Sequence, residues 1–166
     1  KSKFNICLQS EDQDFKSLTK SWFNKSTDYF YSYNFEFIGR PIIQYPQDIV
    51  ATQEIIYKTK PDIIIETGIA HGGSIVLSAS CLSILDVMDG IDPRNSQRKV
   101  IGIDIDIREH NLKALNNHPL CFKWELISGS SIDAKIYEEV KEKIKLNAKV
   151  LVLLDSNHSH DHVFKE

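Results

Sequence analysis

Short apolar runs alternate with helical patterns over most of the chain. Four runs predict strands that lie inside a sheet: "DIIIE" (62–66), "VIGIDID" (100–106), "FKWELIS" (122–128) and "KVLVLLD" (149–155). Three helical patterns lie between them, at 74–88, 108–118 and 131–145, the last with Ile136, Val140 and Ile144 spaced four apart. This β-α-β-α-β-α-β order predicts an α/β fold with a parallel sheet and helices on both of its faces.

The first 45 residues have a different pattern. They are polar at first and strongly aromatic between 22 and 37, without a clean period, which predicts a helix followed by an irregular flap. "GRPIIQYPQD" (39–48) predicts a loop, because it holds a glycine and two prolines. Asp48 is suited to cap a helix that ends near Lys58, and Pro61 forbids its continuation. We therefore divide the chain into residues 1–45, a helix and aromatic flap, and residues 46–166, a Rossmann-like domain.

Composition narrows the class of protein. A length of 166 residues suits one domain, and the net charge of −3 argues against a nucleic-acid partner. No apolar run approaches the roughly 20 residues of a membrane span. The three cysteines (Cys7, Cys81 and Cys121) are odd in number and contain no C-x-x-C pair, which favours a reducing, cytoplasmic location.

The stretch "PDIIIETGIAHGGS" (61–74) places an acid, Glu66, directly before a glycine-rich turn. Dinucleotide sites use G-x-G-x-x-G, whose amides hold a pyrophosphate. A carboxylate in front of the glycines repels a pyrophosphate but attracts an ammonium group. S-adenosylmethionine (SAM) carries an ammonium and a sulfonium and no phosphate, so charge favours SAM over NAD. Glycines would let the backbone approach the methionine part of SAM. The candidate cofactor-binding residues of this turn are Glu66, Gly68, Ala70, Gly72, Gly73 and Ser74.

The ends of the next two predicted strands carry polar residues that suit the rest of such a ligand. Asp104 ends the second strand, where a carboxylate can accept both hydroxyls of a ribose. "SGSSID" follows the third strand and places Ser130, Ser131 and Asp133 near the adenine. Asp133 is better suited to cap the following helix than to contact the adenine.

The fourth predicted strand ends in "LLDSNHSHDH", which holds Asp155, His158, His160 and two further ionisable residues. A spatial strand order of 3-2-1-4 places this segment opposite the glycine turn, across the crevice where α/β sheets bind ligands. Asp155 is the candidate metal ligand, and His158 or His160 is the candidate general base. The alternatives are that these histidines are merely exposed, that they cap the next helix, or that H-x-H-x-H binds zinc.

The segments "GRPIIQYPQD", "PDIIIETGIAHGGSIVLSAS", "VIGIDIDIREHN", "ISGSSID" and "VLVLLDSNHSHDHV" resemble the cephalosporin hydroxylase family, which includes rhamnosyl-type sugar O-methyltransferases. The resemblance covers about residues 38–166 and implies a class I SAM-dependent methyltransferase fold. In many members Mg²⁺ positions the acceptor hydroxyl. Carried over by position, Glu66, Gly68, Gly72, Gly73 and Ser74 form the SAM loop, Asp104 binds the ribose and Asp155 is the first metal ligand. No two-histidine, one-carboxylate iron triad supports hydroxylation.

The sequence departs from the family pattern at its end. Members continue with a helix and a fifth strand that ends in an acidic pair, which supplies further metal ligands, whereas this sequence ends at Glu166. We therefore expect a sheet without the later strands, with strand four as an apolar edge that another copy of the chain can cover. We also expect SAM binding with weak or absent turnover for the chain as given.

The motifs together with the family resemblance imply a SAM-dependent, Mg²⁺-assisted O-methyltransferase. The expected acceptor is a hydroxyl of a sugar, glycolipid, polysaccharide or natural product, reached by in-line methyl transfer. The aromatic flap either closes over this acceptor or is simply packed on the domain. Two alternatives from other classes are a nicotinamide-dependent oxidoreductase and a non-catalytic nucleoside-binding or assembly module.

Overall fold

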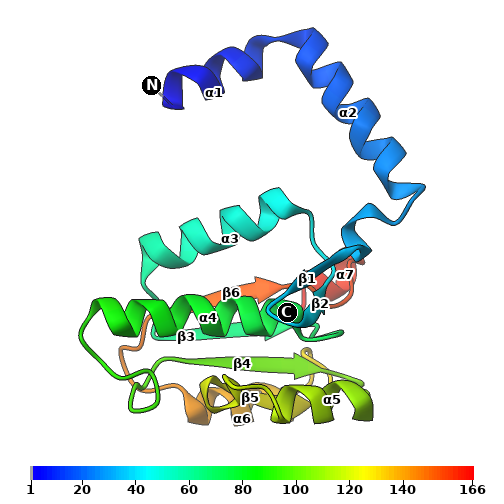
Figure 1. Ribbon diagram of the computed structural model, residues 1–166. Coiled ribbons are helices and arrows are strands. Elements are labelled where there is room, and N and C mark those ends of the chain that lie inside the picture. Colours follow the sequence, from blue (N-terminus) through cyan, green and yellow to red (C-terminus); the bar gives the residue numbers. More distant parts are fainter. Residues whose placement is uncertain (1) are drawn as a thin grey trace.

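A parallel sheet forms the centre of the molecule (Figure 1), seen in a computed structural model that describes residues 2–166. Its strands are β3 (Ile63–Thr67), β4 (Lys99–Asp104), β5 (Trp124–Ser128) and β6 (Val150–Leu154). Their spatial order is β5-β4-β3-β6, so the predicted 3-2-1-4 order is confirmed. Ile65 pairs with Ile101 on one side and Val152 on the other, which places all strand ends at one level.

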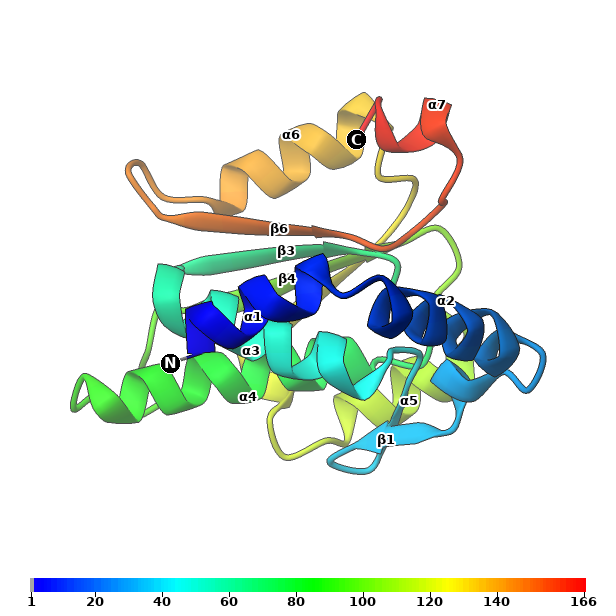
Figure 2. The same ribbon diagram turned by 90° about the horizontal axis from the view of Figure 1, so that it is seen from above.

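Helices cover both faces of this sheet, as predicted (Figure 2). Residues of α3 (Pro46–Thr59), α4 (Gly73–Met88) and α5 (Glu109–Asn116) pack in one core cluster, on one face. α6 (Ala134–Lys143) packs on the other face, through Val140 and Ile136. α4 is apolar almost all round and buries Ile75, Val76 and Leu82 completely. Each such side chain contributes about 1.5–3 kcal/mol to folding, so α4 is the main support of the glycine turn before it.

The N-terminal segment corrects the prediction of one helix and an irregular flap. It contains α1 (Ser2–Glu11), α2 (Gln13–Thr27), the 3-10 turn η1 (Tyr31–Tyr33) and an antiparallel hairpin of β1 (Phe35–Phe37) and β2 (Arg40–Ile42). Asp12 separates the helices, because its side chain accepts the Phe15 N–H at 2.9 Å and caps α2. The hairpin turns at Ile38 and Gly39, which both have positive φ (43° and 79°). A two-residue hairpin turn needs this geometry, but isoleucine rarely signals it.

The helices α1 and α2 extend away from the body of the molecule (Figure 1). Within residues 2–27 only Ser26 is buried, and its hydroxyl lies 2.7 Å from the Tyr45 hydroxyl. Phe23 stacks on Tyr45 at 5.2 Å between ring centroids, so aromatic contacts attach the end of α2 to the loop before α3. α3 itself begins at Pro46, directly after Tyr45, so Asp48 lies in its first turn and is not the predicted cap. The predicted division of the chain at residue 45 stays a prediction.

A buried ion cluster fixes the opposite, amino end of the sheet. Lys123, in the 3-10 turn η2 (Cys121–Lys123), is 1% exposed and donates to Asp86 of α4 and to the Arg98 carbonyl. Arg98 also donates to Asp86, at 3.0 Å. Burial lowers the pKa of Lys123, opposed by its bond to Asp86.

The edge strand β6 exposes alternate apolar side chains: Val150 is 37% exposed, Val152 50% and Leu154 44%. This agrees with the expected apolar edge. Among residues 2–166, no helix has the length and apolar character needed to cross a membrane.

Candidate functional site

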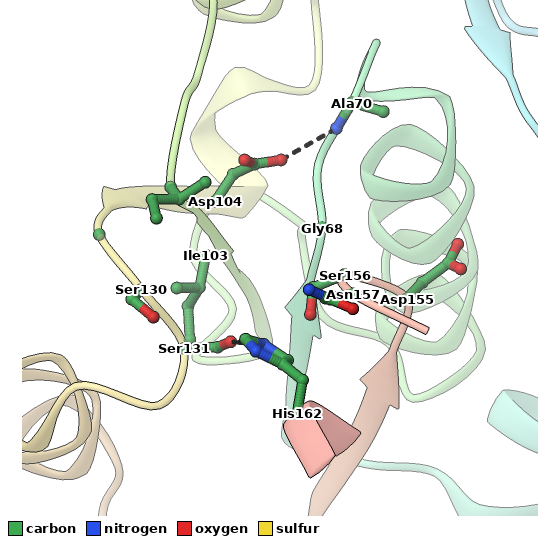
Figure 3. A pocket seen from close by; sticks show the side chains of 12 residues that line it. Gly68, Ala70, Ile103, Asp104, Ser130, Ser131, Asp155, Ser156, Asn157 and His162 are labelled. Carbon is green, nitrogen blue, oxygen red and sulfur yellow. Dashed lines mark hydrogen bonds between the residues drawn. The ribbon is translucent and has the colours of Figure 1, made fainter. Parts of the chain in front are cut away.

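The carboxyl ends of all four parallel strands meet around a cavity of about 310 Å³ (Figure 3). Gly68 follows β3, Asp104 ends β4 and the segment from Gly129 to Ser131 follows β5. Asp155, Ser156 and Asn157 follow β6, and His162 reaches the cavity from α7 (His160–Val163). The strand order therefore brings five of the ten predicted cofactor residues together in what we call the first cavity: Gly68, Ala70, Asp104, Ser130 and Ser131.

The glycine turn is shaped by contacts inside the protein. Gly68 has φ 86°, and a Cβ there would lie 2.1 Å from the backbone oxygen of Asp155. Gly72 has φ 84°, and a Cβ there would lie 2.6 Å from Leu115 of α5. These positions require glycine because strand ends and helices meet here, whereas the sequence analysis explained the glycines by the approach of a ligand.

Asp104 holds the turn from the neighbouring strand. Its Oδ2 accepts the N–H groups of Ile69 (2.7 Å) and Ala70 (3.2 Å), and its Oδ1 accepts the Asp106 N–H (3.0 Å). Figure 3 shows this carboxylate between the turn and the first cavity. A carboxylate has about four acceptor sites, so about one stays free for a ligand hydroxyl. The structure thus leaves Asp104 room for one ribose hydroxyl more readily than for the predicted two.

The serines after β5 line the first cavity, as predicted, but Asp133 does not. The Ser131 hydroxyl contacts His162 Nε2 at 3.2 Å and donates to Glu166. Asp133 is exposed and accepts the Lys135 N–H at 2.8 Å, which makes it the N-cap of α6. Its capping role is the alternative that the sequence left open.

Glu66 differs from the charged acid that the sequence suggested at the mouth of the turn. It is 1% exposed and accepts hydrogen bonds from the hydroxyls of Ser74 and Ser78. Burial, with a contribution from the charge of Asp155, raises the pKa of Glu66 to about 7. It lines not the first cavity but another of about 290 Å³, with Asp48 and Asp155. Near neutral pH its carboxyl is therefore only partly ionised.

The acid and histidines after β6 separate into different environments. The Asp155 side chain is 47% exposed, and its partial burial raises the pKa of its carboxyl. His158 Nε2 lies 3.6 Å from Asp155 Oδ1. His160 is 90% exposed, contacts Asp161 and lines none of the cavities described, so the structure does not bring this predicted base into the site. His162, the last histidine of the H-x-H-x-H pattern, was not chosen as a catalytic or cofactor residue from the sequence, but it lines the first cavity and contacts Glu166, four residues away, at 3.4 Å.

A second cavity of about 310 Å³ lies between the glycine turn and the N-terminal flap. Tyr33, Gln44, Tyr45 and His158 line it together with the turn. It shares Gly68, Ala70 and Asp155 with the first cavity. The two cavities therefore meet at the carboxyl ends of β3 and β6.

Few side chains near the cavities can serve as ligands of a metal ion. Asp155 and His158 are neighbours, but within residues 2–166 no three or more His, Cys, Asp or Glu side chains are arranged to hold a metal ion. The side chains that the structure describes thus do not form a metal centre by themselves.

Comparison with known proteins identifies the family. The family described as rhamnosyl O-methyltransferase/CmcI matches residues 29–166, and the chain belongs to it. Relatives named rhamnosyl O-methyltransferase, from Mycobacterium bovis and Mycobacterium tuberculosis, are 28% identical over 115 residues, which cover 69% of this chain. The matched region covers 42% of each relative, so the chain spans less than half the length of these proteins.

Solved CmcI structures share the fold. One described as the Mg-SAM form has a TM-score of 0.56 and 19% identity, and the match covers 80% of this chain and 50% of that chain. The apo form has a TM-score of 0.53 and 18% identity, with coverage of 78% and 48%. The predicted family resemblance and the predicted Rossmann-like methyltransferase fold are confirmed.

Proposed function

We propose that this chain is part of a SAM-dependent O-methyltransferase that modifies a hydroxyl of a sugar or of a sugar-bearing lipid. The first cavity carries the proposal, because Asp104, the two serines and the glycine turn converge there in a member of this family. Relatives named rhamnosyl O-methyltransferase support a sugar as the acceptor class.

The donor would lie across the first cavity. Its adenosine end suits Asp104, Ser130 and Ser131, which offer hydrogen-bonding oxygens at the ends of β4 and β5. Its methionine end would then point toward Gly68 and Asp155. Glu66 lies behind the turn, where its ionised form would attract the ammonium group through Ser74 rather than by direct contact.

The acceptor would enter the second cavity. Tyr33 and Tyr45 offer ring surfaces for the apolar face of a sugar, and Gln44 offers an amide for its hydroxyls. Because both cavities share Gly68, Ala70 and Asp155, a methyl group bound in the first can face an oxygen bound in the second.

The reaction needs alignment more than covalent chemistry. A bond forms between the acceptor oxygen and the methyl carbon as the carbon–sulfur bond breaks, and the sulfonium becomes a neutral thioether. The acceptor hydroxyl loses its proton. His158 is the base that the geometry favours, because it lines the second cavity beside Asp155, whereas His160 faces solvent.

Asp155 is the one residue that we propose as a ligand of a divalent cation. A relative described as an Mg-SAM form supports this, and a bound cation would lower the pKa of the acceptor hydroxyl. Within residues 2–166, no group of three or more His, Cys, Asp or Glu side chains is arranged to complete such a site.

Two further proposals concern the location of the chain and its assembly. A cytoplasmic location suits three cysteines that are free thiols. A second copy of the chain is our proposed cover for the apolar edge of β6.

Calorimetry with SAM, its demethylated product and NAD tests the proposal. We expect SAM and the product to bind and NAD not to bind. Asp104→Ala should weaken SAM binding about tenfold or more, since it removes charge-assisted hydrogen bonds of about 1.5–3 kcal/mol. Asp106→Ala is the matched control, because Asp106 takes part in the Asp104 contact through its backbone N–H alone. Binding of NAD in place of SAM would contradict the proposal.

A further inference from the structure

Four polar backbone groups at the tip of the glycine turn are held by side chains from other elements. Asp104 accepts the N–H groups of Ile69 and Ala70. Asn111 of α5 donates its Nδ2 to the Ala70 carbonyl at 2.9 Å. Arg40 of β2 donates both Nε and Nη2 to the His71 carbonyl, with the Nε bond at 2.9 Å.

The tip of the turn depends on these bonds because Ala70, unlike the tightly packed glycines on either side of it, is exposed. A cavity of about 340 Å³ is lined by Ala70, His71, Asp104 and Asn111 among others. Ala70 also has φ 46°, a left-handed conformation that costs a non-glycine residue about 1–2 kcal/mol. A turn with an exposed, strained residue at its tip would relax without side chains to hold it.

Arg40 and Asn111 act as one unit. Arg40 Nη2 donates to Asn111 Oδ1 at 2.8 Å, so both ends of the Asn111 amide are engaged. Asn111 is 3% exposed, which makes these bonds hard for water to replace. The unit therefore connects β2, the glycine turn and α5.

The position of Arg40 links the two cavities. Directly after it, the segment from Pro41 to Tyr45 lines the second cavity, while the turn that Arg40 holds lines both. A shift of β2 would thus move the acceptor wall and the donor turn together.

We propose that Arg40 and Asn111 are positioning residues that hold the donor turn in shape and keep it in register with the acceptor wall. This inference rests on the proposed function, and neither residue was a candidate from the sequence. They touch neither donor nor acceptor in this proposal; they act through the carbonyls of Ala70 and His71.

The test compares Arg40→Met, Arg40→Lys and Asn111→Asp with the unmodified chain. Arg94→Met is the matched control, because Arg94 is exposed and lies in the loop before β4. Hydrogen exchange of the ligand-free chain reports on the amides of residues 68–74, and calorimetry reports on SAM affinity. We expect faster exchange of this segment in R40M and N111D, a loss of SAM affinity of about tenfold in R40M, and partial rescue in R40K, whose single ammonium replaces one of the bonds.

The outcomes separate the two proposals. Unchanged exchange of residues 68–74 in R40M would overturn the positioning role, whatever SAM does. Faster exchange with full SAM affinity would overturn it as well, because the turn would then need no holding for binding. An unmodified chain that fails to bind SAM would instead contradict the proposed function, while the exchange data would still decide whether Arg40 holds the turn.

Discussion

At the scale of one residue, the burial of the Glu66 carboxyl makes the free energy of unfolding depend on pH. Its pKa rises from 4.5 to about 7 on folding, so the folded chain holds a proton that the unfolded chain releases. The stabilisation from this proton is complete below pH 4.5 and is lost as the pH rises through 7. Glu66→Gln keeps the neutral shape and removes the titration. Between pH 5 and pH 8, we expect the difference in unfolding free energy, E66Q minus the unmodified chain, to increase by at most about 3 kcal/mol.

Urea denaturation at both pH values measures this difference. Titrating groups far from Glu66 affect both proteins alike and cancel in the comparison, whereas the charge of Asp155, which contributes to the raised pKa of Glu66, is part of the measured effect. A gap between E66Q and the unmodified chain that stays constant with pH would show that the Glu66 carboxyl is ionised throughout.

Gly68 offers a second prediction at this scale. Gly68→Ala forces a Cβ against the Asp155 backbone, whereas Gly90→Ala, at a similar φ of 74°, meets nothing within 4 Å. We expect G90A to cost about 1 kcal/mol and G68A more than about 3 kcal/mol, measured by thermal or urea unfolding. Equal losses would mean that the strand ends can part to accept the methyl group.

Single residues were predictable from sequence where a strand end fixes their place. Glu66, Asp104 and Asp155 lie at a strand end or one residue from it, so the pattern located them at one edge of the sheet. The sequence could not show that Glu66 points inward to Ser74. Nor could it show that His158 lies beside Asp155 while His160 faces solvent. In both cases the direction of the side chain near a strand end depends on the path of the loop that follows. Arg40 gave no signal, since its partners are 31 and 71 residues away.

At the scale of elements, the buried ion cluster joins α4, the loop directly before β4 and η2. Asp86→Ala would leave Lys123, 1% exposed, with the Arg98 carbonyl as its remaining hydrogen-bond partner. We expect a loss of about 3–5 kcal/mol in the free energy of unfolding, as for other buried pairs that lose one partner. Glu125→Ala is the control, because its pairs with Lys99 and Lys143 are partly exposed and worth about 1 kcal/mol or less. A small effect of D86A would show that water reaches Lys123.

The elements of the sheet were predictable to within a few residues, because continuous apolar runs such as 62–66 have few other interpretations in an alternating pattern. The hairpin of β1 and β2 was not, since its strands are three residues long and its turn uses isoleucine. Its pairing is decided by packing on α4, which no local pattern reveals.

At the scale of the whole molecule, the open face of β6 predicts self-association of the chain. Val152 is 50% exposed on an edge strand with neighbouring exposed apolar side chains, and such edges favour pairing. Val152→Lys should shift the sedimentation of the chain toward that of a monomer. Val87→Lys is the control and should not, because Val87 lies near the end of α4 and is 64% exposed. A monomeric chain before any substitution would refute self-association through this edge.

The contact between Gly68 and the Asp155 backbone bears on how substrate range can change. Because this junction has no spare space, the cavity wall at Gly68 and Asp155 cannot move back to make room. In the proposed reaction, bulkier acceptors would therefore have to be accommodated from the opposite side, where residues 32–45 rest on the domain through aromatic contacts. Laboratory evolution toward larger acceptors should therefore gather substitutions in that segment and spare positions 68 and 155.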